Sequence, residues 1–230
     1  MKIIGHRGAA SLALENTKAS LLTALDAEPF GIEFDVRLTK DDRLVLSHDP
    51  DMLRVAGKAV RIRDLTCEEL KKIPLINDDV LLALEEALDI IGSKTQIVLE
   101  FKDDDSAGPL LKVLEKYTGA KIWVASFKLQ ELALLREANP NLVLYGLERT
   151  RPFDIIHFAR QLKLNGIGLN YWILNPLTYW LARHDNLDIY VYTVNNRLLI
   201  WFIHLLYPQV AICTNFPQWY TPHRQSAKAS

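Results

Sequence analysis

Cysteine is scarce in this chain. The only two cysteines, Cys67 and Cys213, lie far apart in the sequence and do not have the spacing of metal ligands. Two distant thiols exclude a disulfide-stapled scaffold, and we expect both to be buried and reduced, as free cysteine usually is. The N-terminal residues also lack the apolar core of a secretory signal peptide. Together these features predict a cytoplasmic protein.

Long apolar runs and an excess of charge of one sign are missing too. The longest apolar run, LLIWFIHLLY at 198–207, is about half as long as a membrane-spanning helix, so we expect no integral membrane segment. Lys and Arg total 27 against 28 Asp and Glu, which leaves no net field to attract nucleic acid or an anionic membrane. Recognition of an anion must therefore come from a local cluster of charges.

What the 230 residues do contain is an ordinary globular composition, 49% hydrophobic and 24% charged. Short runs rich in apolar and β-branched residues alternate with amphipathic helical patterns, as in parallel strands that are covered by helices. The helical patterns include residues 107–118, and Pro152 and Pro176 suit first-turn positions, the latter after Asn175 as an N-cap. The eight strand-like runs are 2–5, 31–36, 96–101, 121–126, 142–147, 166–170, 189–194 and 210–214.

This alternation predicts the α/β class and, within it, a (β/α)8 TIM barrel. We expect a single domain over residues 1–220, followed by a polar tail at 221–230 that we expect to be disordered. An open doubly wound sheet is the alternative. It would place a glycine-rich phosphate turn after the first strand, and GHRGAA at 5–10 does not fit that fingerprint.

A ninth strand-like run, residues 43–47, interrupts the alternation because no helix precedes it. It follows the turn-rich residues 39–42, so we expect residues 31–47 to form a hairpin that turns near Asp41. Such a hairpin brings Ser47 and His48 back beside Asp35. Residues 49–80 then form an irregular insertion with one short helix at 66–73.

Chemically active side chains gather where the predicted barrel strands end, which is where the active sites of such barrels lie. The carboxylates Glu33, Asp35 and Glu100 are expensive to bury together, and they should raise one another's pKa unless a cation balances them. A hard divalent cation such as Mg²⁺ or Ca²⁺ takes carboxylate oxygens, so we predict one such cation here. The alternative is a salt-bridge cluster of these carboxylates with Arg7 and Lys102.

Two of the six histidines, His6 and His48, are expected at the same barrel mouth. Two histidines can share general acid and general base work near neutral pH. Arg7 and Lys102 supply positive charge for an anionic group that also contacts the metal. Acids, bases, a hard cation and fixed cations together suit phosphoryl transfer better than acyl or glycosyl chemistry.

An ordered set of motifs makes this chain resemble the glycerophosphodiester phosphodiesterase family over roughly residues 2 to 217. The motifs are HRG at 6–8, EN at 15–16, EFDVRLTKD at 33–41, SHD at 47–49, LEFK at 99–102 and TVN at 193–195. The resemblance implies a TIM barrel of the kind just described, with residues about 49–75 as a small insertion after strand two. It also implies metal-dependent hydrolysis of a glycerophosphodiester to sn-glycerol 3-phosphate and an alcohol.

The same resemblance implies a role for each site residue. His6 and His48 correspond to the acid/base pair, and Arg7 and Lys102 to the phosphate-binding cations. The implied metal ligands are Glu33, Asp35 and Glu100, and the implied cofactor is one divalent cation, Mg²⁺ or Ca²⁺. The expected partner is a small-molecule glycerophosphodiester and not nucleic acid, while assembly into a homo-oligomer stays open.

The chain departs from the family pattern at three positions. Leu14 stands where members commonly have proline, Asn215 stands where they commonly have an acid, and Tyr192 replaces a tryptophan that would contact the glycerol. Two other functions stay open: a phospholipase-D-like barrel acting on intact phospholipids, and a non-catalytic binding protein. The first would need an apolar, membrane-facing mouth, whereas the aromatic stripes at 170–180 and 198–207 are more typical of a core or a subunit interface.

Overall fold

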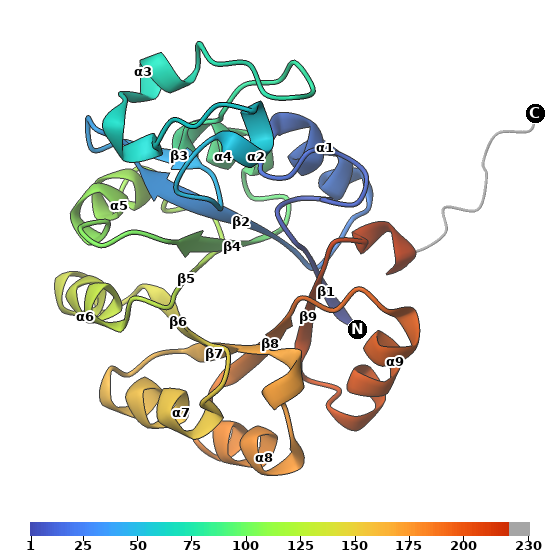
Figure 1. Ribbon diagram of the computed structural model, residues 1–230. Helices are drawn as coiled ribbons and strands as arrows, with labels where there is room; N and C mark the ends of the chain where they lie inside the picture. The colour runs from blue at the N-terminus through green and yellow to red at the C-terminus, as the bar shows by residue number, and fades with distance from the viewer. Residues whose placement is uncertain (221–230) are drawn as a thin grey trace, which may run out of the picture.

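A computed structural model describes residues 1–220 of the chain, and its central feature is a closed barrel of parallel strands (Figure 1). Around the barrel the strands follow the order β1, β9, β8, β7, β6, β5, β4 and β2, and β1 pairs with β2 to close the ring. This arrangement confirms the predicted (β/α)8 TIM barrel and excludes the open sheet. The barrel strands are β1 (Lys2–Gly5), β2 (Gly31–Leu38), β4 (Gln96–Phe101), β5 (Ile122–Ser126), β6 (Val143–Glu148), β7 (Gly166–Asn170), β8 (Asp188–Tyr192) and β9 (Ala211–Thr214).

Seven α-helices and the 3-10 helix η3 (Pro217–Tyr220) follow the eight barrel strands, and both surfaces of the strands are largely buried. Along β2, Phe34 and Val36 pack outward against the helices, and the alternation of a strand turns Glu33 and Asp35 inward. Aromatic rings pack inside the barrel, among them Trp123, which stacks on Tyr145 with 4.6 Å between the ring centroids. The barrel is therefore a packed core whose polar inward residues lie near the strand ends.

Helices form the outer ring, and several begin where the sequence predicted. Pro152 and Pro176 occupy first-turn positions, and the Asn175 side chain accepts a hydrogen bond from the Thr178 N–H as an N-cap. The helix expected at 107–118 ends earlier, at Leu114. The covering helices are α1 (Lys18–Asp26), α4 (Leu84–Ile91), α5 (Ala107–Leu114), α6 (Leu129–Ala138), α7 (Pro152–Gln161), α8 (Pro176–His184) and α9 (Arg197–Leu206).

The extra strand β3 (Leu44–Leu46) confirms the predicted hairpin. It runs antiparallel to the end of β2, with Val36 opposite Leu46, and the Ser47 N–H donates to the Asp35 carbonyl at 3.0 Å. His48 is therefore returned to the level of Asp35, as expected. The hairpin brings the catalytic candidates of two chain segments to one edge of the barrel.

The segment after β3 contains more structure than the sequence predicted. Besides α3 (Cys67–Leu70), which lies within the expected helix at 66–73, it forms α2 (Leu53–Ala56) and the 3-10 turn η1 (Ile62–Asp64). These elements share a small core of their own, which includes Met52, Ile62 and Cys67. Cys67 and Cys213 are both buried free thiols, as expected. The expectation of disorder for residues 221–230 lies outside the described residues.

The aromatic stripes of the C-terminal third contribute only their inward residues to the core. Within 198–207, Ile200 and Ile203 are buried, but Trp201 and Phe202 are about half exposed, at 52% and 51%. Trp172, in the 3-10 turn η2 (Tyr171–Ile173), is 78% exposed. The core interpretation of these stripes is therefore wrong for their outward residues. Over residues 1–220, every helix falls short of the length and hydropathy that spanning a membrane requires.

Candidate active site

His6 and Arg7 follow β1 directly, in a turn that only particular backbone conformations allow. Arg7 and Gly8 have φ values of 50° and 83°, in the left-handed region. A Cβ at Gly8 would lie 2.5 Å from the Ser20 hydroxyl of α1, so glycine lets this turn pack against the helix. The turn aims the Arg7 N–H at Glu33, whose carboxylate accepts its hydrogen bond at 2.8 Å.

Three carboxylates converge beside this turn. Glu33 and Asp35 project from β2, and Glu100 projects from β4, where it is the direct neighbour of Asp35 in the strand register. One oxygen from each group lies within 4.8 Å of the others. Glu33 and Asp35 are buried, and Glu100 is nearly so. The structure thus brings together the three predicted metal ligands.

Two cations contact this cluster unequally. Lys102 Nζ lies 2.7 Å from Asp35 Oδ1 and also forms an ion pair with Glu100. Arg7 Nε lies 3.2 Å from Asp35 Oδ2. Although burial opposes ionisation, Lys102 and Arg7 together hold the pKa of Asp35 well below its usual range. The expectation that the carboxylates raise one another's pKa unless a cation balances them fits Asp35, because Lys102 and Arg7 balance its charge.

The other two carboxylates behave as expected. Burial raises the pKa of Glu33 well above its usual range, and the charges of Asp35 and Glu100 add to the effect. Burial and Asp35 also raise the pKa of Glu100 to about 7, against the opposing influence of Lys102. Two buried carboxyls that resist ionisation mark a site where negative charge is held in excess.

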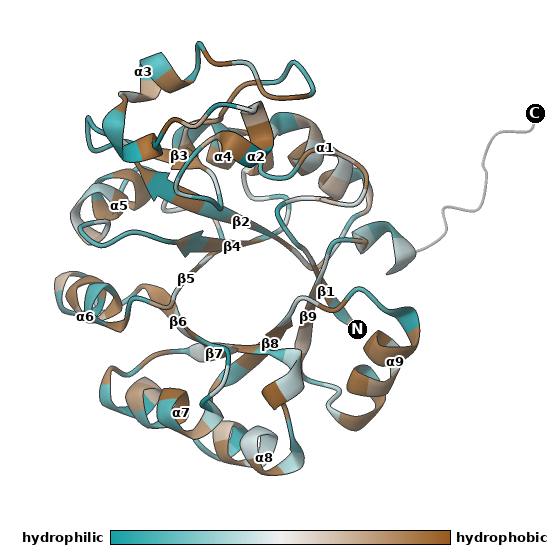
Figure 2. Ribbon diagram, in the orientation of Figure 1, coloured by the Kyte–Doolittle hydropathy of each residue, from teal (hydrophilic) through white to brown (hydrophobic). Residues whose placement is uncertain are grey.

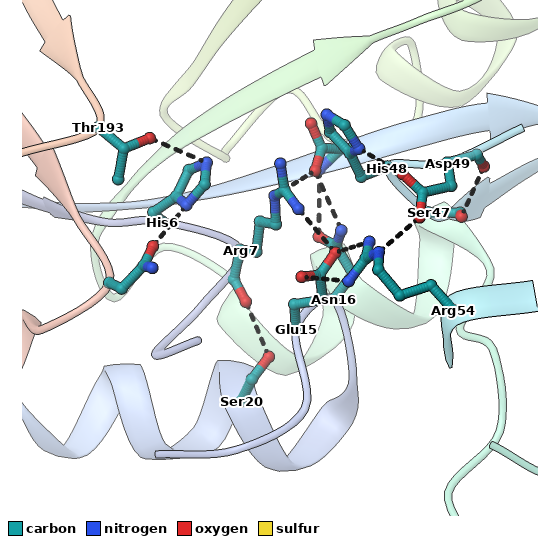
Figure 3. A network of polar contacts seen from close by, with 12 residues as sticks. His6, Arg7, Glu15, Asn16, Ser20, Ser47, His48, Asp49, Arg54 and Thr193 are labelled. Atoms are coloured by element: carbon teal, nitrogen blue, oxygen red, sulfur yellow. Dashed lines mark hydrogen bonds and ion pairs between the residues drawn. The ribbon is translucent and has the colours of Figure 1, made fainter. Parts of the chain in front are cut away.

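His6 is anchored through Nδ1, which makes Nε2 the ring nitrogen that can accept a proton. The Asn215 amide oxygen accepts from Nδ1 at 2.7 Å, so the proton on Nδ1 leaves a lone pair on Nε2. Nε2 lies 4.0 Å from Glu33 Oε2 and 3.4 Å from the Thr193 hydroxyl (Figure 3). Burial, reinforced by the charge of Arg7, lowers the pKa of His6 to about 4. The ring is therefore neutral at pH 7 and able to accept a proton.

His48 is anchored by its neighbour in the chain. Its Nδ1 donates to Asp49 at 2.8 Å, and Arg54 Nε donates to the other oxygen of Asp49 at 2.6 Å. Arg54 also reaches Glu15 through both terminal nitrogens, at 2.9 and 2.7 Å. Glu15 in turn accepts from Arg7 at 2.8 Å. Figure 3 shows this continuous polar network, which runs from His48 to Arg7.

Asn16 adds a second support to the carboxylate cluster. Its amide nitrogen donates to Asp35 Oδ2 at 3.1 Å, and its amide oxygen accepts from the Asp35 N–H at 3.2 Å. Asn16 has φ 57°, a conformation that asparagine tolerates better than most residues. The side chain therefore fixes both the backbone and the carboxylate of Asp35.

Tyr192 lies at the same mouth, at the end of β8. Its hydroxyl donates to the Glu148 carbonyl at 3.0 Å, and its ring meets Phe127 edge-on at 6.2 Å. Together with His6, Glu33 and Glu100 it lines a cavity of about 20 Å³. Tyr192, the predicted substrate contact, therefore lies beside the carboxylates, and its hydroxyl is already hydrogen-bonded within the protein.

The donor set fits a hard divalent cation. Three carboxylate oxygens from rigid strands are close enough to share one ion, and oxygen ligands of this kind suit Mg²⁺ or Ca²⁺. The salt-bridge alternative accounts for Asp35 and Glu100 but leaves the Glu33 carboxylate with a backbone N–H and a histidine as its contacts. A pure salt-bridge cluster is therefore a poorer description of Glu33 than a cation site.

Several supporting residues were not assigned a role from the sequence. Glu15 and Asn16 belong to the EN motif, Asp49 follows His48, and Asn215 is a departure from the family pattern. The sequence therefore drew attention to these four residues but did not show which groups they contact. Arg54 carried none. Its importance depends on how α2 folds back over residues 15 and 49, which only the tertiary structure reveals.

The fold and this set of side chains define a class, a TIM-barrel enzyme whose site is equipped for phosphate esters. The model of the glycerophosphoryl diester phosphodiesterase family matches residues 6–218, and the chain belongs to that family. The match spans all seven predicted site residues and Tyr192, and it confirms the family resemblance that the motifs indicated.

Individual relatives are similar over nearly their whole length. A putative glycerophosphodiester phosphodiesterase of Bacillus subtilis is 28% identical over 214 residues, which cover 86% of this chain and 87% of that protein. A solved structure of a putative glycerophosphodiester phosphodiesterase from Galdieria sulphuraria is 26% identical, covers 94% of each chain and superposes with a TM-score of 0.83. An Oleispira antarctica phosphodiesterase, solved with the product sn-glycerol-3-phosphate, reaches a TM-score of 0.88 over 95% of this chain and 94% of that one. At 20% identity it shows the shared fold.

Proposed function

We propose that this enzyme hydrolyses glycerophosphodiesters to sn-glycerol 3-phosphate and a free alcohol at the mouth of its barrel. The observation that carries the proposal is the convergence of Glu33, Asp35 and Glu100 with two anchored histidines in a member of this family. The product complex of the Oleispira antarctica protein supports the same chemistry. The other open functions, phospholipid cleavage and non-catalytic binding, are separated from it by the assay below.

One divalent cation, Mg²⁺ or Ca²⁺, would be held by Glu33, Asp35 and Glu100. When bound, it supplies charge that stabilises the nonbridging oxygens of a phosphodiester. With all three carboxylates ionised, as ligands of a cation must be, these groups and the cations Arg7 and Lys102 sum to one formal negative charge. A divalent cation converts that to one positive charge, which complements the single negative charge of a phosphodiester.

The chain's own residues would divide the remaining work. Arg7 has its guanidinium between Asp35 and Glu15, where it can orient a phosphate oxygen without moving far. His6, neutral with an unprotonated Nε2, serves as the general base that takes a proton from the attacking oxygen. His48 serves as the general acid for the departing alkoxide; burial lowers its pKa, and Asp35 and the Asp49 carboxylate bonded to Nδ1 oppose that shift in favour of the protonated form.

Lys102 and Tyr192 complete the proposed set. Lys102 lies between Asp35 and Glu100, so it favours the ionised form of both carboxylates, against the burial that raises the pKa of Glu100, and adds a donor towards the phosphate. Tyr192 presents its ring beside the cavity while its hydroxyl is bonded to Glu148, which suits packing against the glycerol carbons. The two buried reduced thiols support the cytoplasmic location expected from the sequence.

A coupled glycerol 3-phosphate assay tests the proposal. Purified enzyme is given glycerophosphocholine, glycerophosphoethanolamine, glycerophosphoglycerol or intact phosphatidylcholine, with chelator or with added Mg²⁺ or Ca²⁺. We expect glycerol 3-phosphate from the water-soluble diesters, its loss with chelator, and its recovery when metal is restored. The Glu33→Gln variant should stay inactive after metal is added.

The alternatives predict other outcomes in the same assay. Choline released from intact phosphatidylcholine, with phosphatidic acid left behind, identifies a phospholipase-D-like enzyme. No release from any substrate in the presence of either metal identifies a non-catalytic protein. Full activity in chelator would reject the cation while leaving the hydrolysis in place.

A further inference from the structure

Arg37 lies on the face of β2 that carries two of the candidate metal ligands. Successive residues of a strand alternate between its two faces, so Arg37 follows Glu33 and Asp35 on the same side, one step nearer the mouth. Figure 2 shows the arrowhead end of β2 in the hydrophilic colour. The Arg37 side chain is only 16% exposed, because two neighbouring segments of the chain engage its guanidinium.

One of these segments carries His48. The Arg37 Nε–H donates to the backbone carbonyl of His48 at 2.8 Å. Strand β3 ends at Leu46, so the peptide of His48 lies beyond the strand pairing of the hairpin. The hydrogen bond from Arg37 therefore ties β2 to the backbone from which the His48 imidazole projects.

The other segment carries Asp103, which follows β4 and fixes Arg37 in turn. One oxygen of the Asp103 carboxylate forms an ion pair with a terminal nitrogen of Arg37, and the other accepts from the Leu38 N–H at 2.9 Å. Leu38 is buried and β4 has already ended at Phe101, so the carboxylate satisfies a backbone donor that is costly to leave unpaired. Arg37 is thus held by the end of β4 while it holds His48.

The contact that Arg37 makes differs from the one that Arg54 makes. Arg54 acts on the imidazole of His48 through Asp49, whereas Arg37 acts on the His48 backbone. The imidazole and the Asp49 carboxylate both move with that backbone, so the hydrogen bond between them does not by itself set the distance from the ring to the carboxylate cluster. Arg37 fixes that distance from the strand that carries two of the three carboxylates.

We propose that Arg37 is a positioning residue that places the His48 imidazole relative to the cation site. The inference rests on the proposed function, in which His48 protonates the departing alkoxide. A guanidinium suits this task because its planar fork meets the His48 carbonyl with one nitrogen and the Asp103 carboxylate with another. A lysine ammonium lacks this fork, so Arg37→Lys should restore only part of the effect.

The dependence of turnover on the leaving group tests the proposal. The alkoxide of choline needs a proton as it departs, whereas p-nitrophenolate is stable without one near neutral pH. Glycerophosphocholine and the p-nitrophenyl ester of sn-glycerol 3-phosphate are compared at saturating Mg²⁺ or Ca²⁺, and the ratio of kcat for the choline ester to kcat for the p-nitrophenyl ester is measured. A misfolded fraction lowers both rates equally and leaves this leaving-group ratio unchanged.

We expect Arg37→Met to lower kcat with glycerophosphocholine about tenfold, while kcat with the p-nitrophenyl ester stays within about twofold of wild type. His48→Ala should lower the leaving-group ratio further, and Arg37→Lys should lie between Arg37→Met and the wild type. Arg63→Met is the matched control, because Arg63 borders the same cavity of about 210 Å³ as Arg37 and donates to another hairpin carbonyl, that of Thr39, at 2.8 Å. Its ratio should equal that of the wild type.

Several outcomes would overturn the proposal. A wild-type ratio in Arg37→Met while His48→Ala lowers it, or an equal fall in Arg63→Met, would reject the positioning role alone. A KM raised equally for both esters, with kcat unchanged, would make Arg37 a substrate contact instead. An unchanged ratio in His48→Ala would reject the general acid that the inference requires, and a wild type that hydrolyses neither ester would reject the proposed function itself.

Discussion

Arg54 connects the insertion to both halves of the proposed catalytic machinery. It holds Asp49, which orients His48, and it holds Glu15, which orients Arg7. Its own side chain is 48% exposed and touches neither of the two groups it serves. Arg54 therefore offers a way to separate effects on positioning from effects on stability.

The structure allows both effects of Arg54→Met to be sized. The variant keeps an unbranched apolar stem and removes the guanidinium. Because half-exposed ion pairs contribute little, the free energy of unfolding should fall by only about 1 kcal/mol. Activity should fall more, by about 10- to 100-fold, as is typical when an outer hydrogen-bonding partner of an active-site group is removed.

Arg63→Met is the matched control. Arg63 also belongs to the insertion, is 46% exposed, and pairs with Asp42 at 3.1 Å and with the Thr39 carbonyl at 2.8 Å, away from both histidines. Urea titration gives the stability of each variant, and kcat/KM with glycerophosphocholine gives its activity. The reasoning is refuted if Arg54→Met keeps kcat/KM within about twofold of wild type, or if Arg63→Met loses as much.

Three further predictions concern the site and the core. His48→Ala should lower kcat about 100-fold or more, as loss of a general acid does, measured by glycerol 3-phosphate release; near-wild-type turnover would exclude the role. In the wild type, burial and the charge of Arg7 lower the pKa of His6 to about 4. Asn215→Asp places a carboxylate against the His6 ring, so the pKa of His6 should rise. Since a base must be neutral, the acidic limb of the kcat/KM profile should move to higher pH, and an unmoved limb would contradict it. Phe34→Ala should cost about 3–5 kcal/mol in urea unfolding, because Phe34 is fully buried.

Most of the barrel was predictable because its strands are buried on both faces. Such strands appear as near-continuous apolar runs, and each of the eight runs overlaps an observed strand. The hairpin was also predictable, since a polar turn between two strands leaves few other paths. Helix α2 was not, because four residues without a strong periodic pattern are held by the small core of the insertion, not by their own propensity.

The candidate site was also predictable only in part. Glu33 and Asp35 stood out because carboxylates inside an apolar strand are costly, and their alternation placed them on one face. What the pattern could not show is how Lys102 and Arg7 distribute their charge, which is why Asp35 ionises readily while Glu33 and Glu100 resist. The outward apolar face of α9 was equally hidden, because hydropathy alone does not tell which side of a helix is covered.

The bond that this enzyme breaks is the most direct test of the account. Phosphorus NMR can follow glycerophosphocholine during turnover by the wild type with Mg²⁺ or Ca²⁺, with Glu33→Gln as the inactive control. The account predicts that the diester signal is replaced by that of sn-glycerol 3-phosphate, in equal amount to the choline released. Phosphocholine as the product, or an unchanged diester signal with either metal, would contradict it.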